Sequence, residues 1–176
     1  MSPADLASAL AADSRRGVEP FNSVAYREAV ARGGRSVSSL SAALSPDAAS
    51  LLALLAIRKI SQDDYRSIDS RLRADILIAA LRNARYFNAW GLPHLFWEDA
   101  ARAVIDEGTA IEPALRTLLS DRRAAPVWGS EGAAEARRYA YRVCDYAWAL
   151  INAIRGSTVT IPVDPQARDA LIAASR

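Results

Sequence analysis

Apolar positions along most of the chain recur at helical spacing, and the alternation typical of strands is nearly absent. Over residues 47–60, leucine, isoleucine and alanine occupy nearly every side of the expected helix. A helix of this kind is buried on more than one side. Only residues 157–161 alternate, and flanking glycine and proline favour a loop there. The pattern therefore predicts an all-α fold.

Start and stop signals place two short helices near the N-terminus. Ser2 followed by Pro3 predicts a helix to about residue 12, because proline suits the first helical turn and serine caps it. A second helix is expected over residues 22–31 and ends at Gly33, a residue that commonly ends helices.

A stretch rich in glycine and serine follows, and it suggests where the chain divides. Residues 32–41 have the composition of a linker. We therefore expect residues 1–44 to form an N-terminal helical arm with its linker, and residues 45–176 to form the main helical domain.

The main domain contains further helix signals. Gly108 and Gly156 stand where helices should end, and Thr109 with Glu112 fits a capping box that opens a helix. Helices are expected over residues 47–60, 70–85, 94–107, 110–119 and 130–155, followed by a last short helix that begins at Asp164.

Two segments of this domain resemble each other at a spacing of about 40 residues. Each has a leucine-containing helix, an arginine in the following turn and a Trp-Gly corner, at Trp90 and at Trp128. The two tryptophans would then fill equivalent corners between helices. Repeated helix pairs at this period predict a helical solenoid.

The stretch from Ala103 to Gly108, with Pro113-Ala114-Leu115 and the leucines and aspartate of residues 118–121, resembles the HEAT-repeat pattern. The resemblance implies a short right-handed stack of antiparallel helix pairs, with the N-terminal arm and the last helix capping its ends. It implies little about activity, because HEAT-like folds serve as scaffolds, chaperones, DNA-repair enzymes and hydroxylases. The His-Glu metal motifs of the hydroxylases are missing.

Composition and charge exclude several classes of protein. Hydrophobic residues make up 51% and charged residues 24%, which is typical of a folded domain and unlike a disordered chain. The 22 basic and 20 acidic residues are interleaved and give a net charge of +2. Nucleic-acid binding is therefore a weaker alternative, which would use arginines on the concave face of the solenoid.

Other absences narrow the chemistry. Cys144 is the single cysteine, which excludes an internal disulfide and a cysteine-rich zinc site. No apolar run approaches the roughly 20 residues that span a bilayer, and the N-terminus lacks the pattern of a signal peptide, so we expect a cytoplasmic protein. No phosphate-binding or nucleophile motif is present, and no cofactor or metal is expected.

The leading hypothesis is a non-enzymatic protein-binding module or scaffold. The helix expected over residues 130–155 has two apolar stripes, and one of them contains the polar-tipped aromatics of a binding surface. The candidate residues are Arg122, Arg123, Trp128, Arg137, Tyr141 and Trp148. Alternatively this stripe packs internally, and Asp145 then pairs with Arg142 or Arg138.

A second hypothesis is an enzyme or small-molecule carrier. His94, the single histidine, and Glu98 would lie one turn apart on a helix and could exchange protons with a substrate. The candidate pocket consists of Trp90, His94, Trp97, Glu98 and Asp145. Cys144 lies mid-helix, which is typical of a small buried apolar residue rather than a nucleophile.

Overall fold

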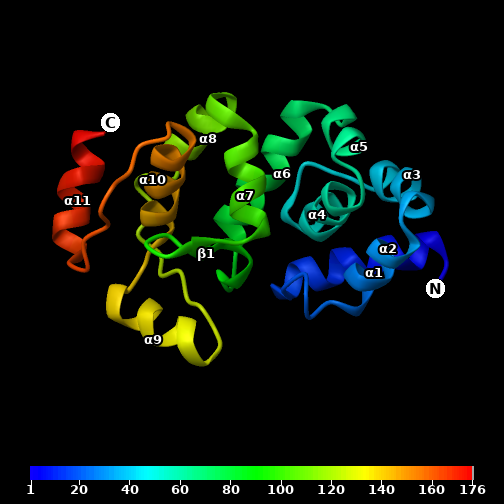
Figure 1. Ribbon diagram of the computed structural model, residues 1–176, viewed down its shortest axis with the longest axis horizontal. Helices are drawn as coiled ribbons and strands as arrows, with labels where there is room; N and C mark the ends of the chain where they lie inside the picture. The colour runs from blue at the N-terminus through cyan, green and yellow to red at the C-terminus, as the bar shows by residue number, and fades with distance from the viewer. Residues whose placement is uncertain (176) are drawn as a thin grey trace. The chain divides into compact units, whose positions relative to one another are not determined.

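Helices make up 66% of the computed structural model, which describes residues 1–175 except for the side chains of residues 130 and 131 (Figure 1). The other regular element in this part of the chain is one two-stranded antiparallel hairpin. The prediction of a helical fold is confirmed, whereas no solenoid is identified in these residues. The helices form two compact units, Met1–Asn83 and the chain from Ala84 onward.

The first unit is built around one apolar helix, α4 (Leu51–Ile60). Every residue from Leu52 to Ile57 is buried, which confirms that this helix is covered on more than one side. Helices α1, α2 and α3 all pack against it. The surrounding elements are α1 (Pro3–Arg16), α2 (Val24–Arg32), α3 (Gly34–Ala42), the 3-10 turn η1 (Ala48–Ser50), α5 (Gln62–Ser67) and α6 (Ser70–Asn83).

The glycine- and serine-rich stretch is a helix rather than a linker. Residues 34–42 form α3, whose Leu40 is fully buried. Burial of this side chain at the packed face of α3 outweighs the weak helix propensity of glycine and serine. The boundary between the compact units follows Asn83 and not residue 44, and residues 1–44 pack into the first unit instead of forming an arm.

Several predicted helix starts are confirmed. The Ser2 hydroxyl accepts a hydrogen bond from the backbone of Asp5 at 3.1 Å, and the Asp5 carboxylate accepts one from the Ser2 backbone at 3.0 Å. The oxygens of Asp69 and Asp164 likewise accept bonds from backbone amides that open α6 and the last helix. Helix α1 runs to Arg16, beyond the expected end, because Leu10 and Asp13 are also buried.

The second unit is built around α10 (Val143–Ile154), in which every residue from Val143 to Ile151 is buried. Helices α7, α8 and α11 pack against α10, and Figure 1 shows α9 apart from that group, with a loop at each end. The elements are η2 (Asn88–Trp90), β1 (Gly91–Leu92), β2 (Phe96–Trp97), α7 (Asp99–Asp106), η3 (Gly108–Ile111), α8 (Glu112–Arg116), α9 (Ser130–Tyr139), α10 and α11 (Pro165–Ala174).

The single helix predicted over residues 130–155 is wrong, because the chain breaks after Tyr139. Ala140 takes a left-handed conformation, with φ 47° and ψ 54°, and Arg142 is extended. Backbone bonds to a distant segment hold this break: the Ala125 amide donates to the Tyr141 carbonyl at 2.8 Å, and the Val143 amide donates to the Arg123 carbonyl at 3.0 Å. No glycine or proline marks the break in the sequence.

The helix predicted over residues 94–107 is also wrong at its start. Residues 91–97 form the hairpin, and α7 begins only at Asp99. Gly91 has a φ of +83°, and a side chain there would collide with the backbone of Phe96. His94 therefore lies in the hairpin turn, so it does not share a helix face with Glu98. The capping box expected at Thr109 is replaced by η3, and Glu112 pairs with arginines instead.

The two Trp-Gly corners are not equivalent, which removes the basis of the predicted repeat. The Trp90 side chain is 1% exposed, whereas that of Trp128 is 65% exposed. The helix before Trp90 has 14 residues, and α8, which precedes Trp128, has 5. Similar sequence signals thus occur in different structural surroundings. No helix within residues 1–175 combines the length and the apolar character needed to cross a membrane.

Candidate functional site

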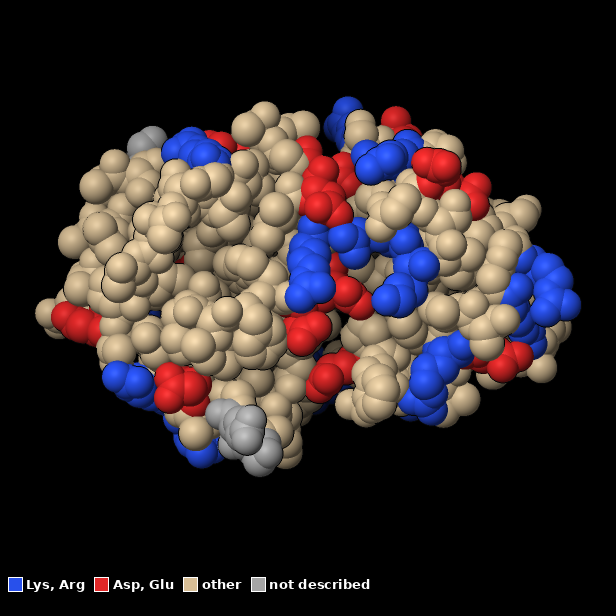
Figure 2. All heavy atoms as spheres, in the orientation of Figure 1, with Lys and Arg blue, Asp and Glu red and all other residues tan. Residues whose placement is uncertain are grey.

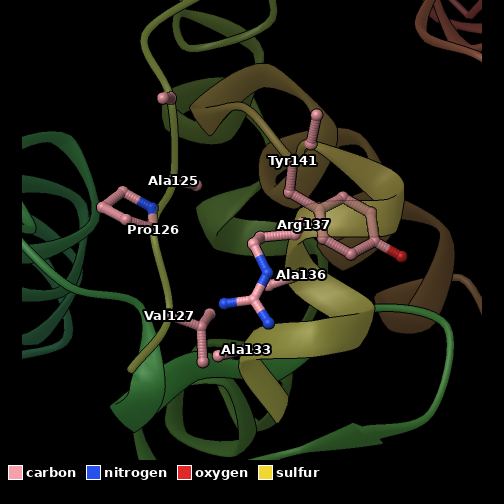
Figure 3. Close-up of a pocket in the computed structure, with 9 residues that line it drawn as sticks. Ala125, Pro126, Val127, Ala133, Ala136, Arg137 and Tyr141 are labelled. Atoms are coloured by element: carbon pink, nitrogen blue, oxygen red, sulfur yellow. The ribbon is translucent and has the colours of Figure 1, made fainter. Parts of the chain in front are cut away.

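The second unit contains an open groove between an extended segment and helix α9 (Figure 3). Its volume is about 180 Å³, and we call it the α9 groove. It is lined by residues 124–127, Ala133, Ala136, Arg137, Ala140 and Tyr141. Except for Arg137 and the Tyr141 hydroxyl, these side chains are apolar, and most are small.

One wall of the groove, residues 124–127, is fixed by hydrogen bonds along its length. The Ala125 amide is bonded to the Tyr141 carbonyl, and the Pro126 carbonyl accepts from the Phe87 amide at 2.8 Å. Just beyond this wall, the Asn88 side-chain amide exchanges two hydrogen bonds with the Trp128 backbone, at 2.7 and 2.9 Å. These internal bonds hold the wall in place, and a wall held in this way reduces the conformational cost of binding.

The opposite wall is helix α9, which presents Ala133 and Ala136 to the groove, and Ala140 lines it directly after the helix ends. Ala133 and Ala136 are three residues apart and so lie on one face of the helix. Their methyl groups leave open space that larger side chains would fill. Fully buried Arg168 donates to the last carbonyl of this helix, that of Tyr139, at 2.8 Å and so fixes its end.

Among the residues whose side chains the structure describes, Arg137 is the one charged residue that lines the α9 groove. Figure 3 shows its guanidinium between α9 and the opposite wall, directed toward Val127. The side chain is exposed, and within the described part of the chain it takes part in none of the ion pairs. It is therefore available for an anionic ligand.

Tyr141 closes one end of the groove and connects it to His94. In Figure 3 its hydroxyl points away from Arg137, and it lies 2.7 Å from His94 Nδ1. The His94 ring stacks on Tyr139 at 4.0 Å between centroids, and Tyr139 stacks on Tyr141 at 5.1 Å. These ring contacts join helix α9 to the hairpin.

The protonation states of this cluster follow from its burial. Burial lowers the pKa of His94, and contact with Glu135 only partly opposes this effect. Burial, followed by the neighbouring Tyr139, raises the pKa of Tyr141. The raised pKa keeps the Tyr141 hydroxyl protonated, and this hydroxyl lies within hydrogen-bond distance of His94 Nδ1. His94 Nε2 lies 3.3 Å from Glu135 Oε2, without good hydrogen-bond alignment.

A buried charge network lies where α10 begins. The Asp145 carboxylate accepts hydrogen bonds from Arg142 at 2.9 and 3.1 Å and lies 3.1 Å from Nε of Arg168. Arg142 also donates to Asp169 at 2.7 Å. Asp145 and Arg168 are 1% and 0% exposed, so a ligand has no access to this pair, and the pair stabilises the fold. The predicted pairing of Asp145 with Arg142 is confirmed.

The six predicted partner-binding residues do not form one surface. Arg137 and Tyr141 line the α9 groove, and Trp128 is exposed at the end of its first wall, with its ring edge-on to Tyr86 at 5.4 Å. Arg122 pairs with Asp169, and Arg123 pairs with Asp121. Trp148 is 3% exposed and donates to Ser175 at 3.1 Å, so its place on a binding surface is wrong. The helix break after Tyr139 separates Trp148 from Arg137.

The residues of the alternative pocket lie in different surroundings. Trp90 and Asp145 are buried, His94 bonds to Tyr141, and Glu98 is exposed just before α7. Trp97 lines a second cavity of about 180 Å³ with Pro93, residues from the end of α10 and the following loop. Cys144 is fully buried, and burial raises the pKa of its thiol, which agrees with its predicted role as a small apolar residue.

Sequence reasoning missed the alanines of the groove. A helical spacing of small residues is present in the sequence, but the same spacing occurs wherever a helix packs closely on a neighbour. Only the placement of residues 124–127 opposite α9 leaves the space unfilled.

The residues that the structure describes contain no group of three or more His, Cys, Asp or Glu arranged to hold a metal ion. Comparison with protein-family models, curated proteins and solved structures found no match for this chain. The resemblance to HEAT repeats therefore stays a prediction from the residues themselves.

Proposed function

We propose that this chain is a non-enzymatic protein-binding module whose α9 groove receives an apolar side chain of a partner protein. The observation that carries the proposal is the groove itself, which is open to solvent, lined mainly by apolar side chains and has one wall fixed by backbone hydrogen bonds. A preformed concave site of this kind binds without a large ordering cost.

Trp128 supports a protein as the partner. Its side chain is 65% exposed although its backbone is bonded on both sides to Asn88. A tryptophan held at the edge of a concave site is typical of the residues that contribute most to binding energy at protein interfaces. The exposed ring thus extends the groove into a larger contact surface.

The titratable groups near the groove favour binding over catalysis. His94 is bonded to Tyr141 and stacked on Tyr139, and the Tyr141 hydroxyl is occupied by that same bond. Asp145 is enclosed by arginines. Within the described residues, each group that faces the groove and could transfer a proton is therefore already bonded to a partner inside the protein.

Nucleic-acid binding receives less support. On the face drawn in Figure 2, acidic and basic side chains are interspersed, with no continuous basic stripe. Arg122 and Arg123, which precede the first wall of the groove, are paired with Asp169 and Asp121, and only Arg137 among the described residues offers an unpaired cation to the groove. A phosphate backbone is normally bound by several unpaired cations on one surface.

The proposal is tested by selection from a library of random heptapeptides on the full chain, with counter-selection on the variant Ala133→Phe. The phenyl ring that this substitution introduces at residue 133 fills the groove from the α9 side. Peptides that bind the native chain but not this variant support the proposal, provided that circular dichroism shows the variant to be folded. Peptides that bind both proteins equally, or no enriched peptides, would overturn it.

A further inference from the structure

We infer that the α9 groove recognises the C-terminus of a partner protein, with a last aliphatic side chain in the groove and the terminal carboxylate on Arg137. This inference rests on the proposed function and specifies the partner's chemistry. It follows from the size of the groove, from its charge and from the position of that charge.

The size of the groove limits the ligand to one side chain. A cavity of about 150 Å³ in a protein core holds one benzene molecule. The α9 groove, at about 180 Å³, is therefore suited to a single leucine, isoleucine or valine side chain. Its alanine, proline and valine lining has no buried polar group that would select a polar side chain.

The charge of the groove calls for one carboxylate. A guanidinium binds a carboxylate through two parallel hydrogen bonds, and Arg137 is the only charged residue among the described side chains of the lining. The next residue, Arg138, instead lies 3.6 Å from the Glu135 carboxylate, and its guanidinium is 5.8 Å from the Tyr139 ring centre. Arg137 is therefore the cation that a ligand in the groove would meet.

The position of Arg137 favours a chain terminus over an internal acidic residue. The guanidinium lies within the lining of the same small groove that takes the apolar side chain (Figure 3). Only a C-terminal residue carries an aliphatic side chain and a carboxylate on one Cα. An internal aspartate or glutamate carries its carboxylate on one residue, and the aliphatic side chain belongs to another residue. This groove is too small to hold both of these side chains.

The test uses two heptapeptide libraries of equal diversity on the full chain. One library ends in a free carboxylate, and the other continues into a fixed Gly-Ser tail. We expect enrichment only from the first library, with leucine, isoleucine or valine at the last position. The best peptide is then synthesised as the acid and as the amide, and the two affinities are measured by fluorescence polarisation.

The amide should bind at least about tenfold more weakly than the acid, because one charge-assisted pair is lost. Arg137→Met should weaken binding of the acid by a similar factor and leave the amide nearly unchanged. Arg138→Met, the same substitution on the neighbouring residue, is the matched control and should keep the affinity for the acid. Arg137 is exposed, so its loss should not unfold the chain.

The outcomes separate this inference from the proposed function. In one outcome, peptides from the tailed library are enriched and lose their binding in Ala133→Phe. In another, the acid and the amide bind with equal affinity. Either result leaves the binding module in place and overturns C-terminus recognition. Failure of both libraries to yield peptides sensitive to Ala133→Phe overturns both. An acid-dependent affinity that Arg137→Met does not reduce would also overturn the role given to Arg137.

Discussion

The two units are each built around an apolar helix, but those helices are held in different ways. Helix α4 has only apolar side chains buried between Leu52 and Ile57, and its neighbours contribute leucines such as Leu6 and Leu40. Helix α10 is equally buried, yet it begins at a network of charges in which Asp145 and Arg168 are almost completely enclosed.

This difference shows which part of the molecule depends on specific partner residues. An apolar core tolerates changes in proportion to the volume lost, whereas a buried ion pair fails when either partner is removed. The charge network also fixes the end of α9 through Arg168, so the α9 groove depends on it. The proposed binding surface thus belongs to the unit with the less tolerant core.

The comparison can be tested because all four tryptophans lie after residue 83. Tryptophan fluorescence therefore reports on the second unit, whereas far-ultraviolet circular dichroism reports on the helices of both units. Urea titrations followed by both signals distinguish a change in one unit from a change in the other.

The largest effect is expected from Asp145→Ala, which leaves buried Arg168 without its carboxylate. We expect a loss of about 3–5 kcal/mol in the free energy of unfolding, seen in the tryptophan signal. Asp75→Ala, at an exposed position of α6, is the control and should change stability by less than about 0.5 kcal/mol. A small effect of Asp145→Ala would show that the network is not needed for the second unit.

The next largest effect is expected from Leu54→Ala in α4. Its side chain is fully buried, and the cavity should cost about 3 kcal/mol. The circular dichroism transition should then begin at lower urea concentration than the fluorescence transition, because only the first unit is weakened. Coincident transitions would contradict the expectation that the two units unfold separately.

Ala140→Gly should stabilise the second unit by about 0.5–1 kcal/mol, because glycine adopts the left-handed conformation without steric cost. Ala136 lies inside α9, four residues before Ala140, with ordinary helical geometry, so Ala136→Gly should destabilise the second unit by about 1 kcal/mol. The two substitutions are chemically identical, so opposite shifts of the fluorescence midpoint confirm the strain at Ala140. Equal shifts would argue against it.

The smallest effect expected is a dependence of stability on pH through His94. Its pKa in the folded chain is lowered from the ordinary 6.5, chiefly by burial. As the pH falls through 6.5, the unfolded chain binds a proton before the folded chain does, so stability decreases on acidification and is fully present above that pH.

The groups facing His94 are Glu135, Arg138, Tyr139 and Tyr141. Since His94 is the single histidine, thermal melts at about pH 7.5 and 5.5 should differ in the native chain and differ less in His94→Gln. A native chain with greater stability at the lower pH would contradict the lowered pKa.

The sequence predicted the first unit better than the second. The apolar run of α4 and the caps at Ser2 and Asp69 follow local rules, and each is confirmed. Helix α3 was missed because its glycine and serine residues are weak helix formers, and burial of Leu40 outweighs their propensity.

The candidate site was predicted only in part. Arg137 and Trp128, recognised by residue type, lie in or beside one groove, whereas Tyr141 is 2% exposed and belongs to the core at the end of that groove. Trp148 was assigned to the same surface because residues 130–155 were expected to form one helix. The break at Ala140, which no glycine or proline marks, turns Trp148 into the core instead.

The sequence by itself determined the helical class, the apolar character of α4 and several helix starts, because these depend on residues close together in the chain. Only the tertiary structure decided the break between α9 and α10, the hairpin around His94 and the open space of the groove. These depend on bonds between distant residues, such as those of Ala125 with Tyr141 and of Arg168 with Tyr139. Such bonds form only when the fold brings the distant partners together, so local sequence patterns do not contain them.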